Sequence, residues 1–199
     1  MITQKEIENS LKTISEYDEN EFLDNFNKTL QKQNYISQFL TESVNINKLD
    51  KQTESSFAEL IFYILKIYED KYQEKYKIAD IQDIVDTMKN RNDRLNNIAN
   101  KFGLSPDDKD FDKKFAEHFY RFNMVVSGNK NKLENLSNKE YNLFMEISNE
   151  NKKHILEPKV SEYANIFFTT DKDMNEDKKQ IINSLTETVI ETLNNIHKW

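Results

Sequence analysis

FAELIFYILKIY, residues 57–68, contains the longest unbroken apolar run of the chain, Leu60–Leu65. Apolar side chains recur through this stretch at spacings of three and four, which is the period of one helix face. Phe62, Leu65 and Ile67 extend the apolar surface most of the way round the helix. A helix that is apolar on nearly every side is normally buried. We therefore predict a helix over residues 51–76 at the centre of the fold.

The rest of the chain is also predicted to be helical. Only 2 Gly and 2 Pro occur in 199 residues, far fewer turn residues than a β-rich or α/β fold of this length needs. Capping boxes such as Thr3 with Glu6 and Asp18 with Glu21 mark helix starts. We predict a single all-α, bundle-like domain, residues 1–199, with about seven helices, short polar loops and a bend at 103–106. The expected helices are 3–16, 19–43, 51–76, 78–102, 106–127, 137–155 and 175–198, with a short or irregular segment near 159–169.

Residues 78–102 carry a regular apolar stripe. Its members alternate at spacings of four and three, and Asn92 occupies one position that the pattern would make apolar. Ile78, Ile84 and Ile98 widen the stripe, which favours a bundle helix over a two-stranded coiled coil. We expect the stripe to be core, and Asn92 either to fix the helix register inside the bundle or to face solvent at a slight bend. The stripe is Ile81, Val85, Met88, Leu95, Ala99 and Phe102.

A second stripe is aromatic and runs along the helix expected at 106–127. Phe111, Phe115, Phe119 and Phe122 recur at spacings of four and three. Large apolar side chains on one helix face are typically core residues, so we predict that this stripe is structural.

Composition and charge narrow the classes of function. The net charge of -7 disfavours general binding to nucleic acid or acidic membranes. The absence of cysteine excludes disulfides, thiolate zinc sites and cysteine nucleophiles, and favours a reducing compartment. The first twenty residues lack the apolar core of a signal peptide, and no apolar run is long enough to cross a bilayer. We expect a cytoplasmic protein without a membrane span. The abundance of Lys, Asn and Ile is typical of an AT-rich genome.

The residue types that commonly act in catalysis or metal binding do not form a known motif in this sequence. Gly103 and Gly128 are too far apart to form a phosphate-binding loop, and no nucleophile motif with flanking glycines occurs. Glu150, His154 and Glu157 have spacings that place them on one helix face, but such a set is more typical of a solvated helix end than of a metal site. We therefore predict no catalytic residue, no metal and no cofactor.

Residues 95–105, LNNIANKFGLS, resemble the first helix and turn of a bacterial helix-turn-helix. In that motif a small residue, here Ala99, is followed four residues later by glycine, here Gly103, so that two helices pack closely. The resemblance implies DNA binding. The continuation, PDDKDFD at 106–112, is acidic and departs from the motif. The alternative is a glycine helix end followed by a Ser-Pro helix start.

One basic stretch stands out in this acidic chain. Lys89, Arg91, Arg94 and Lys101 lie within thirteen residues, and two of the three arginines are among them. Arginine forks suit phosphate or carboxylate groups, so these residues are the candidate binding site for a partner or polyanion. The alternative is that they pair with acids of neighbouring helices.

Three hypotheses for function follow. The first is a non-catalytic protein-interaction module, such as a regulator, an inhibitor or a small structural subunit, with another protein as partner. The second is a helical nucleic-acid-binding subunit that uses residues 89–101. The third is an enzyme whose carboxylates, such as Glu117 or Glu150, face a pocket.

Overall fold

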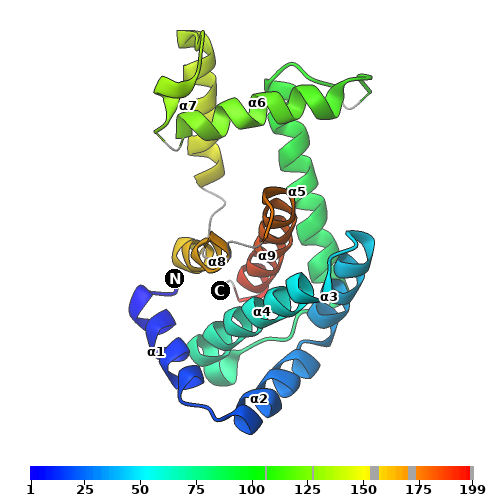
Figure 1. Ribbon diagram of the computed structural model, residues 1–199, viewed down its shortest axis with the longest axis vertical. Helices are drawn as coiled ribbons and strands as arrows, with labels where there is room; N and C mark the ends of the chain where they lie inside the picture. The colour runs from blue at the N-terminus through cyan, green and yellow to red at the C-terminus, as the bar shows by residue number, and fades with distance from the viewer. Residues whose placement is uncertain (106, 127, 153–156, 170–173, 198–199) are drawn as a thin grey trace. The chain divides into compact units, whose positions relative to one another are not determined.

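The structure is a computed structural model that describes residues 1–105, 107–126, 128–152, 157–169 and 174–197. Its regular elements within these ranges are helices, which confirms the all-α prediction, although nine α-helices are present instead of about seven (Figure 1). No helix in these ranges is long and apolar enough to span a membrane. The helices are α1 (Gln4–Ser15), α2 (Glu19–Lys32), α3 (Asn34–Ile46), α4 (Lys51–Tyr72), α5 (Ile81–Lys101), α6 (Phe111–Val126), α7 (Asn138–Lys152), α8 (Pro158–Thr169) and α9 (Glu176–Ile196), with short 3-10 turns η1 (Gln73–Lys75) and η2 (Lys130–Lys132).

The chain divides into two compact units. The first consists of Met1–Met88 together with Leu156–Trp199, and the second of Lys89–Ile155. The bend predicted at 103–106 lies inside the second unit, in the loop that follows α5.

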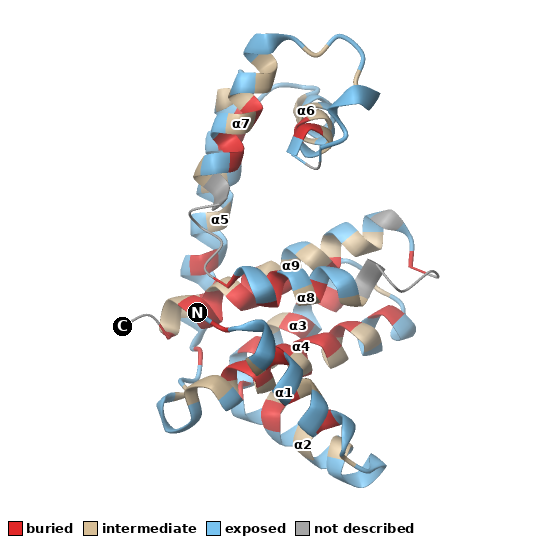
Figure 2. Cartoon of the chain, turned by 90° about the vertical axis from the view of Figure 1, so that its left-hand side faces the viewer, coloured by how far each residue is buried: buried red, intermediate tan, exposed pale blue. Residues whose placement is uncertain are grey.

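Helix α4 forms the core of the first unit, as its sequence predicts. It contacts α1, α2, α8 and α9, which surround it in Figure 1. Leu60, Ile61 and Phe62 are fully buried, as is Tyr68 one and a half turns further on. The buried residues shown in Figure 2 concentrate on the faces of these helices that turn toward α4. Burial on nearly all sides explains why polar residues are so rare between Phe57 and Tyr68.

The prediction of one continuous helix over 19–43 is wrong, because the chain breaks at Gln33. The Gln33 backbone leaves the helical region, with φ -99° and ψ 53°, and the residue ends α2 and precedes α3. Its fully buried side chain donates to the Lys77 carbonyl at 3.0 Å and accepts from the Ala79 amide at 3.0 Å. The segment 76–80 has no regular secondary structure. Gln33 therefore satisfies backbone groups that burial would otherwise leave unpaired.

His197 holds the same segment from the other side. Its Nε2 accepts a hydrogen bond from the Lys77 amide at 3.0 Å, and its Nδ1 lies 2.7 Å from the Leu193 carbonyl. The ring stacks on Tyr72 with 4.2 Å between centroids. Burial lowers the pKa of His197 below its ordinary value of 6.5. The neutral ring is therefore the form that the fold stabilises.

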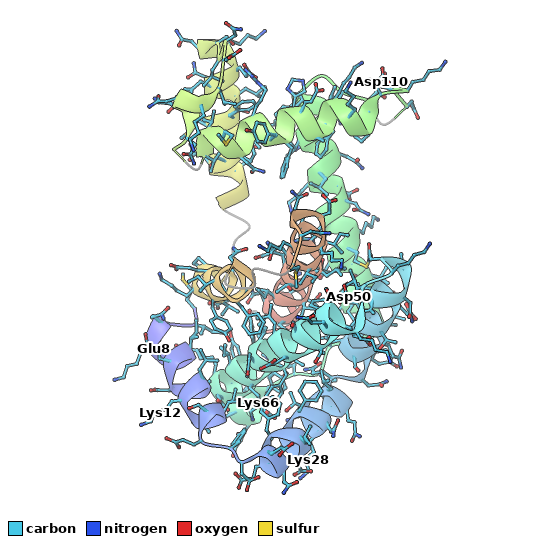
Figure 3. The ribbon with its side chains drawn as sticks, viewed as in Figure 1. Glu8, Lys12, Lys28, Asp50, Lys66 and Asp110 are labelled. Atoms are coloured by element: carbon cyan, nitrogen blue, oxygen red, sulfur yellow. The ribbon has the colours of Figure 1, made fainter. Side chains whose placement is uncertain are left out.

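Ion pairs join neighbouring helices at the surface of the first unit (Figure 3). Lys71 of α4 donates to Glu6 of α1 at 2.7 Å, and this bond lowers the pKa of Glu6 to about 2. Asp50, labelled in Figure 3, caps α4 by accepting from the Thr53 amide at 3.0 Å and also pairs with Lys178 of α9. Exposed pairs of this kind add little stability each, so burial around α4 remains the main contribution.

The aromatic stripe of α6 forms the core of the second unit, as predicted. Phe122 is buried and meets the fully buried Phe144 of α7 edge-on at 5.9 Å. Phe115 and Phe119 are partly buried and stack in sequence along the helix at 5.8 Å. The rings therefore hold α6 against α7 and do not form an exposed recognition face.

The start of α6 differs from the prediction, whereas the glycine end of α5 agrees with it. Helix α6 begins at Phe111, not at residue 106, so Asp107 and Asp108 precede it. The Asp108 carboxylate accepts from the Ser105 amide at 3.2 Å, which stabilises a turn before the helix. Gly103, with φ +74°, ends α5 in the left-handed conformation, and this confirms the glycine helix end.

Residues near 159–169, predicted to be a short or irregular segment, form the regular helix α8. Pro158 is its first residue, where a missing amide hydrogen costs nothing. Val160 and Ala164, four residues apart, are buried on one side. Just before the helix, the buried Glu157 carboxylate accepts from the Ile2 amide at 2.5 Å. Tertiary packing therefore stabilises a helix that its weak apolar pattern does not indicate.

The His197 environment generates a pH prediction. Because burial lowers its pKa, the unfolded chain binds a proton more readily than the folded chain does. The stability that neutral His197 contributes is present above the unfolded value of 6.5 and is lost as the pH falls through that value toward the lower pKa of the folded state. We expect the thermal midpoint, followed by circular dichroism, to fall by a few degrees between about pH 7.5 and about pH 5.5.

His197→Gln keeps a donor and an acceptor but does not titrate. It should lower the midpoint at neutral pH and reduce the fall on acidification. An equally large fall in both proteins would show that His197 is not responsible.

Candidate functional site

The predicted basic residues all lie on α5. Asp80 and Asp83 cap the start of this helix reciprocally, with amide-to-carboxylate distances of 2.8 and 2.9 Å. Lys89 is exposed, whereas Arg91 and Arg94 are half-buried.

Lys101 differs from the other three basic residues. Its ammonium donates to Glu146 at 2.9 Å and to Glu150 at 2.7 Å, both on α7. These hydrogen bonds, that to Glu150 foremost, raise the pKa of Lys101. At this position the structure shows pairing with acids of a neighbouring helix, the alternative considered from the sequence.

Most of the apolar stripe of α5 is exposed, so the prediction that all of it is core is wrong. Ile81 is 60% exposed, Val85 49% and Met88 43%, and these three side chains share one face at spacings of four and three. Ile78, just before the helix, is 55% exposed. We call Ile81, Val85 and Met88, with Ile78 before them, the α5 stripe. All four belong to the first unit.

A different face of α5 packs inward. Ile84 is 5% exposed and Thr87 1%. The Thr87 hydroxyl donates to the Asp83 carbonyl at 2.8 Å and accepts from Asn195 of α9 at 3.3 Å. The inward face therefore consists of one isoleucine and one threonine, and the more regular apolar face remains outside.

Further along α5, in the second unit, Ile98 and Ala99 are buried, whereas Leu95 is 42% exposed. Asn92 is exposed, so the hypothesis that it forms hydrogen bonds inside the bundle is wrong and the solvent-facing alternative is correct.

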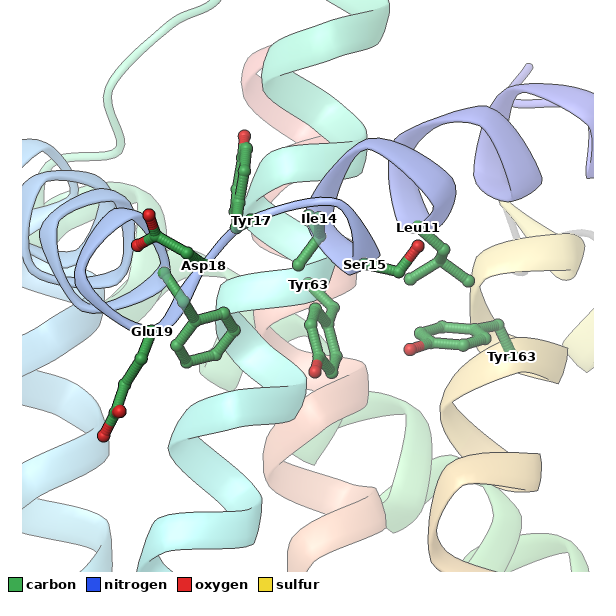
Figure 4. A pocket seen from close by; sticks show the side chains of 9 residues that line it. Leu11, Ile14, Ser15, Tyr17, Asp18, Glu19, Tyr63 and Tyr163 are labelled. Carbon is green, nitrogen blue, oxygen red and sulfur yellow. The ribbon is translucent and has the colours of Figure 1, made fainter.

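A pocket of about 470 Å³ opens beside the junction of α1 and α2 (Figure 4). Tyr63 of α4 and Tyr163 of α8 lie side by side in its wall, with Ile14 and Leu11 of α1 above them (Figure 4). The remaining lining residues are Ser15, Tyr17, Asp18, Glu19 and Phe22. No motif predicted this pocket, because its walls come from three segments far apart in the sequence: residues 11–22, Tyr63 and Tyr163.

Three polar groups of this pocket, those of Tyr63, Ser15 and Asp18, have structural roles. The Tyr63 hydroxyl donates to Glu59 at 2.5 Å, and burial together with this carboxylate raises the pKa of Tyr63, so that its phenol stays neutral near pH 7. The Ser15 hydroxyl donates to the Lys12 carbonyl at 2.7 Å, and Asp18 caps α2. The pocket is an aromatic depression in which these hydroxyls are donors to the protein itself.

The structure does not join the acids considered for a metal site or an enzyme. Glu150 is on α7 and pairs with Lys101, whereas Glu157 precedes α8 and bonds the Ile2 amide. His154 lies outside the described residues. Glu117 is exposed on α6. Among the side chains that the structure describes, no three His or acidic groups are close enough to hold a metal ion.

The geometry after α5 differs from a helix-turn-helix. Helix α5 ends at Lys101 and α6 begins at Phe111, so nine residues separate them. The motif requires a turn of about three or four residues. The resemblance therefore covers a glycine helix end and does not extend to the arrangement that places a helix in the DNA groove.

No known protein family, curated protein or solved structure matches this chain. The site is therefore interpreted from its own geometry.

The basic residues generate a test of nucleic-acid binding. The net charge is -7, and Lys101 already bonds two carboxylates, so we expect no binding of single-stranded or duplex oligonucleotides by fluorescence anisotropy, even at low salt. The opposite result would be binding that weakens with salt. In that case the double variant Arg91→Glu, Arg94→Glu should not bind, and Lys130→Glu should bind as the wild type does. That pattern would support the nucleic-acid hypothesis.

Proposed function

We propose that this protein is a non-catalytic, helical protein-interaction module that uses the α5 stripe as its docking surface. One observation carries the proposal: a regular row of large apolar side chains stays in solvent on α5, although the first unit has a complete core around α4. Exposed apolar side chains scattered singly are normal, but a contiguous row is typical of an interaction site.

The stripe can contribute part of the free energy of a protein interface. Burying a whole Ile, Val or Met side chain is worth roughly 1.5–3 kcal/mol. Four side chains that are each about half exposed therefore offer roughly 3–6 kcal/mol, with Ile78 and Ile81 the most exposed. Association costs about 4–15 kcal/mol in lost translational and rotational freedom, so the partner has to add contacts of its own beside the stripe.

The charges along the same helix suit a protein partner. Asp80, Asp83 and Asp86 lie at its N-terminal end, and Lys89, Arg91 and Arg94 follow Met88. An apolar row flanked by both signs of charge resembles the core and rim of a protein interface. A nucleic-acid backbone would be repelled by the acidic end. Regulator, inhibitor and small structural subunit are all roles that such a surface supports.

Matched variants test this proposal. Val85→Asp introduces a charge into the stripe, and Leu23→Asp introduces the same charge on α2 at a side chain of similar exposure, 50% against 49%. Tagged wild-type and variant proteins at native expression are compared by quantitative mass spectrometry of pull-downs. We expect at least one partner whose recovery falls about tenfold or more with Val85→Asp and not with Leu23→Asp.

Two outcomes would contradict the proposal. One is the absence of any partner, including other copies of the chain, above background. The other is equal recovery with both variants.

A further inference from the structure

We propose that the pocket beside the junction of α1 and α2 binds a small organic cation whose charged group is an alkylated ammonium. None of the residues that line this pocket belongs to α5, so the site is separate from the α5 stripe. The proposal therefore does not depend on the proposed function.

Aromatic rings form much of the pocket wall. Tyr63 of α4 and Tyr163 of α8 lie side by side (Figure 4), and Phe22 of α2 and Tyr17 belong to the same lining. The face of an aromatic ring carries partial negative charge and attracts a cation within about 6 Å of its centre. A ligand that enters the pocket therefore meets a surface that is apolar and also favours positive charge.

Hydrogen bonding makes one of these rings more electron-rich. The Tyr63 hydroxyl donates to the Glu59 carboxylate at 2.5 Å. A phenol that donates to a carboxylate is polarised, and the face of its ring becomes more negative. Burial and the charge of Glu59 also raise the pKa of Tyr163, so this phenol stays neutral near pH 7. The two rings therefore attract a cation as neutral phenols, with a carboxylate close to both.

The charged residues that line the pocket are acidic. Asp18 and Glu19 lie at the start of α2, and none of the nine lining residues is Lys, Arg or His. The two helix ends that meet here carry opposite partial charges, because α1 ends at Ser15 and α2 begins at Glu19, and these partial charges offset each other. The two carboxylates therefore determine the sign of the local potential, which favours a cation and disfavours an anion.

A basic residue of α4 interacts with the pocket residue Tyr17, but its charge is balanced. This residue, Lys66, pairs with Glu69 at 2.8 Å and with Asp70 at 3.8 Å. Its ammonium therefore does not cancel the negative potential of the pocket.

The apolar part of the wall favours an alkylated ammonium over a bare one. Leu11 and Ile14 of α1 lie beside the tyrosine rings (Figure 4). A bare ammonium is strongly hydrated, and apolar side chains cannot replace the hydrogen bonds that it would lose. Alkyl groups give the cation an apolar surface that this wall can bury, and aromatic side chains recognise quaternary ammonium groups in this way. The volume of about 470 Å³ is within the range of small-molecule sites.

Choline and its neutral isostere 3,3-dimethylbutan-1-ol test the proposal, because the isostere replaces the ammonium nitrogen with carbon. Each compound is titrated into the full ¹⁵N-labelled chain, and binding is followed through the amide signals in ¹H–¹⁵N correlation spectra. We expect choline to shift the amide signals of residues 11–22, Tyr63 and Tyr163, with a dissociation constant in the millimolar range. The isostere should bind at least about fivefold more weakly.

Three variants separate the contributions of charge and ring. Glu19→Gln removes a charge from the pocket and should weaken choline binding about twofold or more, whereas Glu42→Gln removes the same charge from an exposed position on α3 and should leave binding unchanged. Tyr163→Leu replaces a ring with an apolar side chain and should weaken binding at least about fivefold. Because Tyr163 is partly buried, the spectrum and thermal midpoint of that variant check its fold.

Four outcomes would overturn the proposal. The first is that choline shifts no amide signal of the pocket. The second is equal binding of choline and the isostere, which would show an apolar depression without selectivity for charge. The third is a set of shifts spread over the acidic surface, which would show general counterion association. The fourth is an equal effect of Glu19→Gln and Glu42→Gln, which would place the bound cation outside this pocket.

Discussion

The arrangement of the first unit depends on how the segment 76–80 is held. This segment follows the 3-10 turn η1 at the end of α4 and leads into α5 without regular secondary structure. Gln33 bonds the Lys77 carbonyl and the Ala79 amide, and His197 accepts from the Lys77 amide. Two side chains from distant parts of the chain thus satisfy backbone groups that would otherwise cost about 1–3 kcal/mol each when buried. They fix the place where α5 begins.

Once its start is fixed, the rotation of α5 follows from its inward contacts. Ile84 enters the core, and Thr87 meets Asn195 of α9. A helix can bury only part of its circumference against one neighbour, so the face that bears Val85 and Met88 turns to solvent. Its exposure is a consequence of packing elsewhere in the unit, and it creates the surface on which we base the proposed function.

Much of this fold is predictable from the sequence. Helix caps mark the starts of α1 and α2, the apolar stretch 57–68 identifies the central helix, and the spacing of the phenylalanines identifies the core of the second unit. These signals are local. The break at Gln33 is not predictable in this way, because its cause is a hydrogen bond to residues 77 and 79. The pocket between α1 and α8 has no local signal either. The orientation of α5 was missed because two of its faces are apolar, and only the tertiary contacts of Ile84 and Thr87 decide between them.

Site-specific photo-cross-linking tests the central claim, that this protein binds a partner through the α5 stripe. A photoreactive side chain replaces Val85 in one protein and Leu23, a side chain of similar exposure on α2, in the control. Cross-linked products are identified by mass spectrometry. Our account predicts a partner that is captured from position 85 and not from position 23. No capture from position 85, or equal capture of the same proteins from both positions, would contradict it.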